Sequence, residues 1–184
     1  RGLGDVYKRQ VGGRMFRRLY PSEDTQSIYD IDFRSFHERG YNTVLFDIDN
    51  TLVEHGAPAT EREIAFFKDL HAMGYETCLI SNNKEPRVAS FAKQVKSRYI
   101  YKAGKPSPDG YLKAIQLCGS AKEKTLFVGD QLFTDVWGAN KAGVYSILVK
   151  PIHPKEEIQI VLKRRLEWVV LIFYRRYKKK HGKD

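Results

Sequence analysis

The sequence predicts an α/β fold in which helices cover both faces of a parallel, five-stranded sheet. Short apolar runs alternate with longer segments that carry apolar residues at helical spacing, as expected where parallel strands are joined through helices. Three of the apolar runs end in Asp, Ser or Gly-Asp, and such sheets bind ligands beyond the carboxyl ends of their strands. We therefore expect a three-layer domain with one functional edge.

The elements follow one another from Thr43 onwards. Strands are predicted at 43–47, 76–80, 99–101, 125–128 and 145–149. Helices are predicted from near Thr60 to Gly74, from near Pro86 through Val95, from Pro108 to Cys118, and from about Thr134 to Gly143. The first helix has a capping box, because Glu63 follows Thr60 by three residues.

One catalytic domain is expected, with an extension at each end. The 184 residues, 42% of them hydrophobic, suffice for one domain with a core. We place the core at 42–151, an N-terminal arm at 15–41 and a basic, amphipathic C-terminal helix at 152–184. Residues 1–14 are interpreted as a non-native leader, because residues 5–10 read as a translated sequencing adaptor and the first methionine is Met15.

The positive charge gathers at the two ends of the chain. Residues 1–19 carry +5 and residues 163–184 carry +7 of the net +10, which leaves −2 for the remainder. Basic ends indicate an anionic partner, either a membrane or a nucleic acid. Nucleic acid is the weaker interpretation, because no recognition motif accompanies the charge.

The C-terminal segment favours a membrane surface. The apolar run 168–174 is flanked by Lys and Arg. As a helix it would be only ~10 Å long, too short to cross the ~30 Å hydrocarbon core. Its aromatic ends and flanking cations suit a helix that lies on an anionic membrane. The alternative is a terminal helix that packs Trp168, Leu171 and Ile172 on the domain and leaves a solvated basic end.

The composition favours a cytoplasmic protein. No run reaches the ~18 apolar residues of a spanning helix. Cys78 and Cys118 have no CxxC spacing, so they predict neither a disulfide framework nor a zinc site. A reducing compartment is therefore expected. The sequence assigns no oligomeric state.

Asp47 and Asp49 are the candidate catalytic pair. They follow the apolar run 43–46, and residues at i and i+2 on a strand point the same way. Two carboxylates held so close repel each other and need a cation to stay ionised. Mg²⁺ is the expected ion, because it prefers oxygen ligands. The alternative is that both are turn residues, which are common at strand ends.

Further polar residues fall at the same predicted edge. Ser81 follows the run 77–80, and Gly129-Asp130 ends the run 125–128. Lys105 lies in the loop after the third strand, and Asp135 follows Asp130 by five residues. These positions predict a metal-assisted phosphoester site.

In this order the residues match four motifs, DxDxT, Ser/Thr, Lys and GDxxxxD, and the chain resembles the haloacid dehalogenase superfamily of phosphatases. The resemblance implies its Rossmann-like fold, with Asp47 as a nucleophile that becomes an aspartyl phosphate. It implies Asp49 as general acid and then general base, and Mg²⁺ bound by Asp47, Asp130 and the Asp49 backbone carbonyl.

The resemblance also implies roles for the remaining site residues. Ser81, with Asn82 beside it, and Lys105 would bind the phosphoryl group. Asp135 would support the metal site without binding the ion. Two alternatives stay open: Asn82 and Asn83 could cap the following helix, and Asp135 could be an acidic residue favoured by a helix N-terminus.

Longer stretches are similar to the YqeG family, whose members are small, uncapped phosphatases of subclass IIIA of this superfamily in Gram-positive bacteria. They are residues 16–21, 46–53, 81–83, 101–106, 129–136 and 138–143. Mitochondrial relatives dephosphorylate phosphatidylglycerophosphate, so the resemblance implies a phospholipid phosphomonoester as substrate.

The spacing of the motifs agrees with such a substrate. The thirty residues from Thr51 to Ser81 are filled by one loop, one helix and one strand, which leaves no room for a cap domain. An open site admits a large or membrane-bound phosphate. We therefore expect a peripheral enzyme at the inner face of the plasma membrane. The alternatives are a phosphatase of a phosphoprotein, nucleotide or other soluble phosphomonoester, and a non-catalytic protein associated with membrane or nucleic acid.

Overall fold

The computed structural model of the chain describes residues 18–153 and 158–181. They belong to two compact units, one at Pro21–Pro154 and the other formed by Arg1–Tyr20 with Lys155–Asp184. The expected leader at 1–14 and the start at Met15 lie outside the described residues. So do residues 154–157 and 182–184 of the predicted C-terminal segment.

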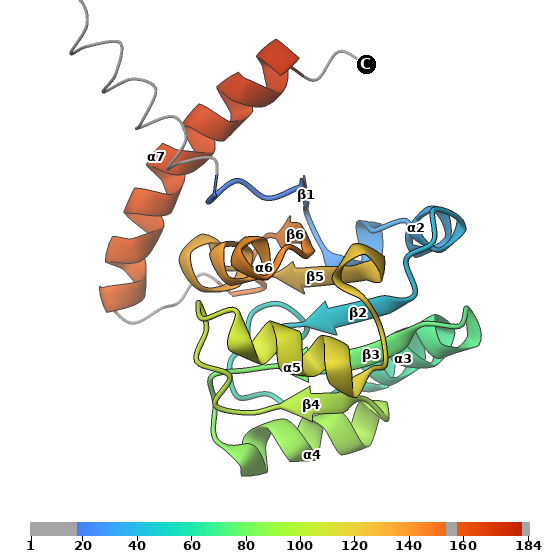
Figure 1. Cartoon of the computed structure of the whole chain (residues 1–184). Helices are drawn as coiled ribbons and strands as arrows, with labels where there is room; N and C mark the ends of the chain where they lie inside the picture. The colour runs from blue at the N-terminus through green and yellow to red at the C-terminus, as the bar shows by residue number, and fades with distance from the viewer. Residues whose placement is uncertain (1–17, 154–157, 182–184) are drawn as a thin grey trace, which may run out of the picture. The chain divides into compact units, whose positions relative to one another are not determined.

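A parallel sheet forms the centre of the larger unit (Figure 1). Its strands, in the order β1-β6-β5-β2-β3-β4, are Glu23–Thr25 (β1), Tyr145–Val149 (β6), Thr125–Gly129 (β5), Thr43–Phe46 (β2), Glu76–Ile80 (β3) and Arg98–Ile100 (β4). β2 is central and pairs in parallel with β3 and β5. Every residue of β2 and β5 is buried, as expected of strands covered on both faces.

The predicted parallel α/β sheet is confirmed, with one strand more than the expected five. The additional strand, β1, comes from the segment expected to be an N-terminal arm, and it pairs with β6. That segment also contains the 3₁₀ turn η1 (Ile28–Asp30) and helix α2 (Phe33–Glu38). β1 has the sequence Glu-Asp-Thr, so it lacks the apolar alternation by which strands are identified.

The predicted helices are present with small shifts. They are α3 (Glu61–Ala72), α4 (Glu85–Val95), α5 (Asp109–Leu117) and α6 (Trp137–Ala142), with a 3₁₀ turn, η2, at Lys122–Lys124. Thr60 caps α3, and its backbone N–H donates to Glu63 Oε2 at 2.9 Å, which confirms the capping box. The helix expected from about Thr134 begins earlier, with a π-helical turn, η3 (Leu132–Val136).

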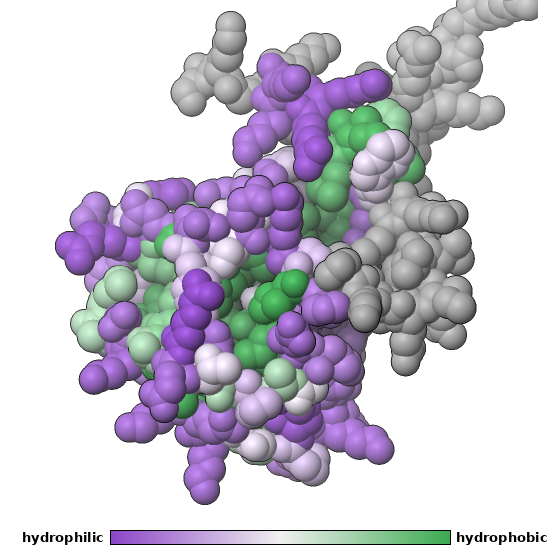
Figure 2. Space-filling model, turned by 180° about the vertical axis from the view of Figure 1, so that it is seen from behind, coloured by the Kyte–Doolittle hydropathy of each residue, from purple (hydrophilic) through white to green (hydrophobic). Residues whose placement is uncertain are grey.

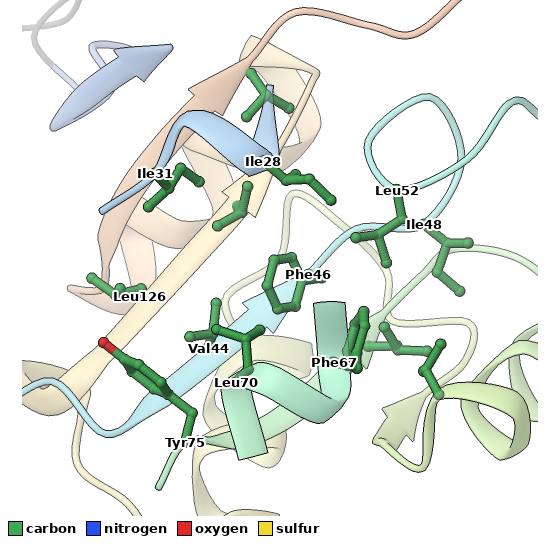
Figure 3. Close-up of a cluster of buried hydrophobic side chains, with 14 of the residues drawn as sticks. Ile28, Ile31, Val44, Phe46, Ile48, Leu52, Phe67, Leu70, Tyr75 and Leu126 are labelled. Carbon is green, nitrogen blue, oxygen red and sulfur yellow. The ribbon is translucent and has the colours of Figure 1, made fainter. Parts of the chain in front are cut away.

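Alternate strand residues face two separate cores. Val44 and Phe46 of β2 pack with α3 and α4, together with Phe67 and Leu70 (Figure 3). Leu45 points to the opposite face, where side chains of α5 and α6 cover it. The period of two along each strand thus produces the three predicted layers. The two cores, one on each face of the sheet, hold the strands and therefore their carboxyl ends in place.

The C-terminal helix is described by itself. α7 spans Ile158–His181. Val170 and Tyr174 are buried, whereas Trp168, Val169 and Phe173 are 65%, 42% and 47% exposed. The Tyr20 ring lies 5.4 Å from the ring of Tyr174 and 5.8 Å from that of Tyr177, measured between centroids. Among the described residues, no helix combines the length and the apolar character needed to span a bilayer.

Tyr111 of α5 connects the packing to the functional edge. Its hydroxyl lies 3.0 Å from the Asp135 carbonyl oxygen and 3.1 Å from that of Thr134. Gly138 lies directly against the ring, and a Cβ at this position would come within 2.6 Å of it. A side chain at 138 would therefore push Tyr111 away from the backbone of Asp135.

Gly138→Ala should destabilise the fold by about 1 kcal/mol or more, because overpacking outweighs the helix propensity gained by Ala. Urea denaturation measures the effect. Lys113→Ala, at an exposed position of α5, serves as control and should change stability by less than about 0.5 kcal/mol. Equal stabilities of the Gly138→Ala variant and the native protein would contradict the close contact with Tyr111.

Candidate active site

The predicted site residues gather at the carboxyl edge of the sheet. Asp47 follows β2, Ser81 follows β3 and Asp130 follows β5, while Lys105 lies in the loop after β4. All four are buried, and so is Asp135 in η3. Side chains that follow four different strands therefore lie buried at one edge of the sheet.

Lys105 joins two carboxylates inside this cluster. Its Nζ atom lies 2.5 Å from Asp47 Oδ1 and 2.6 Å from Asp135 Oδ1. The lysine side chain is only 4% exposed, and that of Asp135 is completely buried. Charges so far from water must be paired, because desolvating a lone ion costs several kcal/mol. The ammonium group therefore orients Asp47 and neutralises part of the buried negative charge.

Negative charge exceeds positive charge in this cluster. Carboxylate oxygens of Asp47, Asp130 and Asp135 all lie within 4.8 Å of one another, with Lys105 as the cation bonded to two of them. Burial raises the pKa of Asp47 to about 7; Lys105 opposes this shift, and the charges of Asp135 and Asp49 add to it. Burial lowers the pKa of Lys105, but Asp135 and Asp47 outweigh it and raise that pKa above its ordinary value.

The donor set fits a divalent cation. Three buried carboxylates lie together, and carboxylate oxygens are the ligands that Mg²⁺ prefers. Thr51 Oγ1 lies 3.2 Å from Asp130 Oδ1 and 3.4 Å from Asp47 Oδ2, between the two expected ligands. Asp135 has both oxygens engaged, one with Lys105 and the other with the Gln131 N–H at 3.0 Å. Asp47 likewise has both oxygens engaged, one with Lys105 and the other with Thr51, so the three carboxylates together form the candidate cation site.

Gly129 allows the Asp135 side chain to reach this position. A Cβ on Gly129 would lie 2.7 Å from the Asp135 carboxylate. In the motif formed by Gly129, Asp130 and Asp135, the glycine is therefore needed for steric reasons and the aspartates for chemical ones. The glycine removes the side chain that would displace Asp135 from Lys105.

Asp49 bonds to a different part of the site. Its Oδ1 accepts from the Gly56 N–H at 2.8 Å and from Arg87 Nη2 at 3.0 Å, and its Oδ2 accepts from Asn83 Nδ2 at 2.5 Å. The side chain thus faces the start of α4, and its carboxylate is not among the three that cluster around the cation site. The chain turns sharply after Asp49, since Asn50 adopts a left-handed conformation with φ 65°.

Ser81 and its neighbours connect the loops. Ser81 Oγ accepts from the Asn83 N–H at 3.2 Å. The Asn82 side chain binds the backbone of Lys105, accepting from its N–H at 2.8 Å and donating to its carbonyl at 3.2 Å. Asn82 therefore fixes the loop that carries Lys105. Phosphate binding by Asn82, Ser81 and Lys105 stays a prediction.

Three residues that the sequence interpretation left without a role contact the site. Thr51 lies between Asp47 and Asp130, Arg87 pairs with Asp49, and Tyr111 holds the backbone of Asp135. Thr51 belongs to the DxDxT motif, which could have indicated it. Arg87 lies in the first turn of α4, whereas Asn83 lies in the loop before that helix, and Arg87 matches no motif in the sequence. Tyr111 carries no signal in the sequence.

Comparison with known proteins identifies relatives of this chain. A family model of haloacid dehalogenase-like hydrolases matches residues 64–143. "Probable phosphatase YqeG" of Bacillus subtilis is 34% identical over 159 residues, which are 85% of this chain and 92% of that protein. Phosphatidylglycerophosphate phosphatase 1, chloroplastic/mitochondrial, of Arabidopsis thaliana is 25% identical over 171 residues, which are 83% of this chain and 47% of that protein.

A solved structure shares the fold. A hypothetical protein of Xanthomonas campestris matches with a TM-score of 0.51 and 16% identity, over 71% of this chain and 76% of that one. Such a likeness concerns the fold alone. The similarity to YqeG covers nearly the whole of that relative and includes the residues of the acidic cluster. The chain therefore belongs to the YqeG family of haloacid dehalogenase-like phosphatases.

Proposed function

We propose that this phosphatase is a Mg²⁺-dependent phosphomonoesterase that forms an aspartyl phosphate, and that it dephosphorylates phosphatidylglycerophosphate at an anionic membrane surface. The observation that carries the mechanism is the buried Asp47, held by Lys105 at the carboxyl edge of the sheet beside Asp130. A nucleophilic carboxylate must be fixed and ionised, and Lys105 favours both.

Each step of the mechanism has a residue. An Asp47 oxygen bonds to phosphorus while the ester P–O bond breaks, and Asp49 gives its proton to the departing alcohol oxygen. Asp49 then accepts a proton from water, whose oxygen bonds to phosphorus as the bond to Asp47 breaks. Phosphate leaves, and both carboxylates return to their initial state. Ser81 and Lys105 would bind the phosphoryl oxygens during both steps.

Asp47, Asp130 and the backbone carbonyl of Asp49 would hold Mg²⁺. When bound, the ion neutralises negative charge on the phosphoryl oxygens and on the clustered carboxylates. Lys105 and Asp135 keep Asp47 in a fixed orientation, and Thr51 bridges the two carboxylate ligands. The protein thus supplies an arranged, water-poor site before the substrate arrives.

The lipid substrate is supported by the lack of an inserted cap in the described chain and by a named relative. Between Asp49 and Ser81 the described chain forms a loop, α3 and β3, with no cap domain inserted there. An uncovered site suits a phosphate that projects from a bilayer. The Arabidopsis relative is named as a phosphatidylglycerophosphate phosphatase, although this chain spans about half of its length.

α7 supports contact with an anionic surface. Its exposed apolar residues, Trp168, Val169 and Phe173, precede the cations Arg175 and Arg176. Apolar and hydrophilic residues lie side by side on the described part of this helix (Figure 2). Aromatic residues next to cations favour the interface of a membrane with anionic headgroups. We therefore place the enzyme at the cytoplasmic face of the membrane, as a peripheral protein.

Asp47→Asn should lower phosphate release from phosphatidylglycerophosphate by more than about 10³-fold, because the nucleophile is lost. EDTA should abolish release by the native protein, and excess Mg²⁺ should restore it. The assay presents phosphatidylglycerophosphate in vesicles of phosphatidylglycerol and phosphatidylcholine. Asp69→Asn, at an exposed position of α3, should match the native rate. Turnover of a soluble aryl phosphate without release from the lipid would overturn the substrate and favour a soluble phosphomonoester.

Mg²⁺ should stabilise the protein more at pH 8 than at pH 6. The folded-state pKa of Asp47, about 7, lies above its ordinary value of 3.8, so the metal-free protein loses stability as pH rises through 7. The metal needs the ionised carboxylate and competes with the proton. Thermal unfolding with Mg²⁺ or EDTA at the two pH values measures the difference. The same Mg²⁺ shift at both pH values would show that Asp47 does not titrate with the metal.

Replacing Trp168 and Phe173 by Ser should reduce activity on vesicles about tenfold or more and leave activity on 4-nitrophenyl phosphate unchanged, because both side chains are exposed. Phosphate release from the two substrates measures the effect. Leu117→Ser removes an exposed apolar side chain of α5 and should change neither activity. Equal losses on both substrates would indicate that α7 supports the fold instead.

A further inference from the structure

Asp49 is held in place by three hydrogen bonds to its carboxylate. Three donors from three parts of the chain converge on its carboxylate: the Gly56 N–H, Arg87 Nη2 and Asn83 Nδ2. The side chain of Asp49 is 12% exposed, and that of Arg87 is 22% exposed. Both therefore lie at the border between the buried cluster and solvent, where a substrate would enter.

We propose that Arg87, acting with Asn83, is a positioning residue that fixes the Asp49 carboxylate beside the phosphoryl site. The inference rests on the proposed phosphatase mechanism. Arg87 belongs to none of the motifs in the sequence, and its role depends on the contact that it makes with Asp49.

Asn83 connects Asp49 to the expected phosphate-binding residue. Its side chain donates to Asp49 Oδ2, while its backbone N–H donates to Ser81 Oγ at 3.2 Å. One residue thus sets the position of the proton-transfer group relative to Ser81. Two oriented bonds on a single residue leave little freedom for the distance between them.

Arg87 completes this arrangement from the first turn of α4. Its guanidinium carbon lies 5.4 Å from the centre of the Phe91 ring, and Phe91 is completely buried. The aromatic ring fixes one side of the planar group, and Asp49 Oδ1 fixes the other. A lysine could supply the charge at this position but not the planar group, which both stacks and donates.

The bonding pattern leaves one oxygen of Asp49 available for the reaction. Oδ1 receives two donors, from Gly56 and Arg87, whereas Oδ2 receives one, from Asn83. Each carboxylate oxygen has two lone pairs, so Oδ2 can also bond the ester oxygen or the water. Proton transfer requires heavy atoms ~2.6–3.2 Å apart, so rotation of the carboxylate would cut the rate.

A pair of aryl phosphates separates positioning from a merely structural role. Phenolate is a much stronger base than 4-nitrophenolate, so phenyl phosphate needs the proton from Asp49 more than 4-nitrophenyl phosphate does. The ratio kcat/KM reports the transfer to Asp47, during which the leaving oxygen is protonated. A damaged fold would lower kcat/KM for both substrates equally, whereas a misplaced Asp49 would not.

Arg87→Gln should lower kcat/KM about 100-fold for phenyl phosphate and less than about tenfold for 4-nitrophenyl phosphate, since acid catalysis contributes on the order of 10²–10⁴. Asn83→Ala should show the same dependence on the leaving group. In an Asp49→Asn background, Arg87→Gln should cause no further loss. Arg98→Gln, which breaks an ion pair with Glu76 at the opposite edge of the sheet, should behave as native.

The outcomes separate the two proposals. Equal losses on both aryl phosphates, or a further loss in the Asp49→Asn background, would overturn the positioning role and leave the phosphatase mechanism intact. A native protein that hydrolyses neither the aryl phosphates nor phosphatidylglycerophosphate with Mg²⁺ would overturn the proposed mechanism, and the role of Arg87 with it.

Discussion

The contact of Lys105 with Asp47 and Asp135 is the interaction on which the rest of the site depends. The three side chains come from the loop after β4, the end of β2 and the turn after β5. Removing the cation would leave two buried carboxylates uncompensated, which is far more costly than losing a surface pair. The surrounding residues maintain this contact: Asn82 fixes the Lys105 backbone, and Gly129 leaves space for Asp135. The pairing of Lys105 with Asp47 and Asp135 therefore constrains both the packing of these loops and the orientation of the proposed nucleophile.

Much of this arrangement follows from local sequence. Apolar runs that end in Asp or Ser predicted the carboxyl edge, because strand burial and parallel pairing depend on short-range patterns. The capping box at Thr60 and Glu63 is equally local. The orientation of Asp49 could not be predicted in the same way. It depends on a loop amide at Gly56 and on Arg87, which lies 38 positions after Asp49 in the chain. An isolated Arg in a helix has no pattern that reveals its partner.

α7 shows a different limit of sequence interpretation. Within the segment 152–184, where a basic amphipathic helix was predicted, the structure describes a helix of 24 residues, Ile158–His181. Lys, Arg and Leu are good helix formers, so the basic flanks continue the helix instead of ending it. Apolar residues of one run also divide between environments, since Val170 is 3% exposed and Trp168 is 65% exposed. Composition identified the charge and the aromatic residues, but packing determines which of them stay accessible.

The two outermost strands of the sheet, β1 and β4, have three residues each. The central strands are apolar and would pair readily with strands of another molecule if they lay at an edge. β1 covers β6 with two acidic residues, and β4 begins with Arg98, which pairs with Glu76. Each edge strand is therefore short and carries charged residues. An enzyme that crowds at a surface with its own copies would gain from such edge strands, because they oppose sheet-to-sheet aggregation.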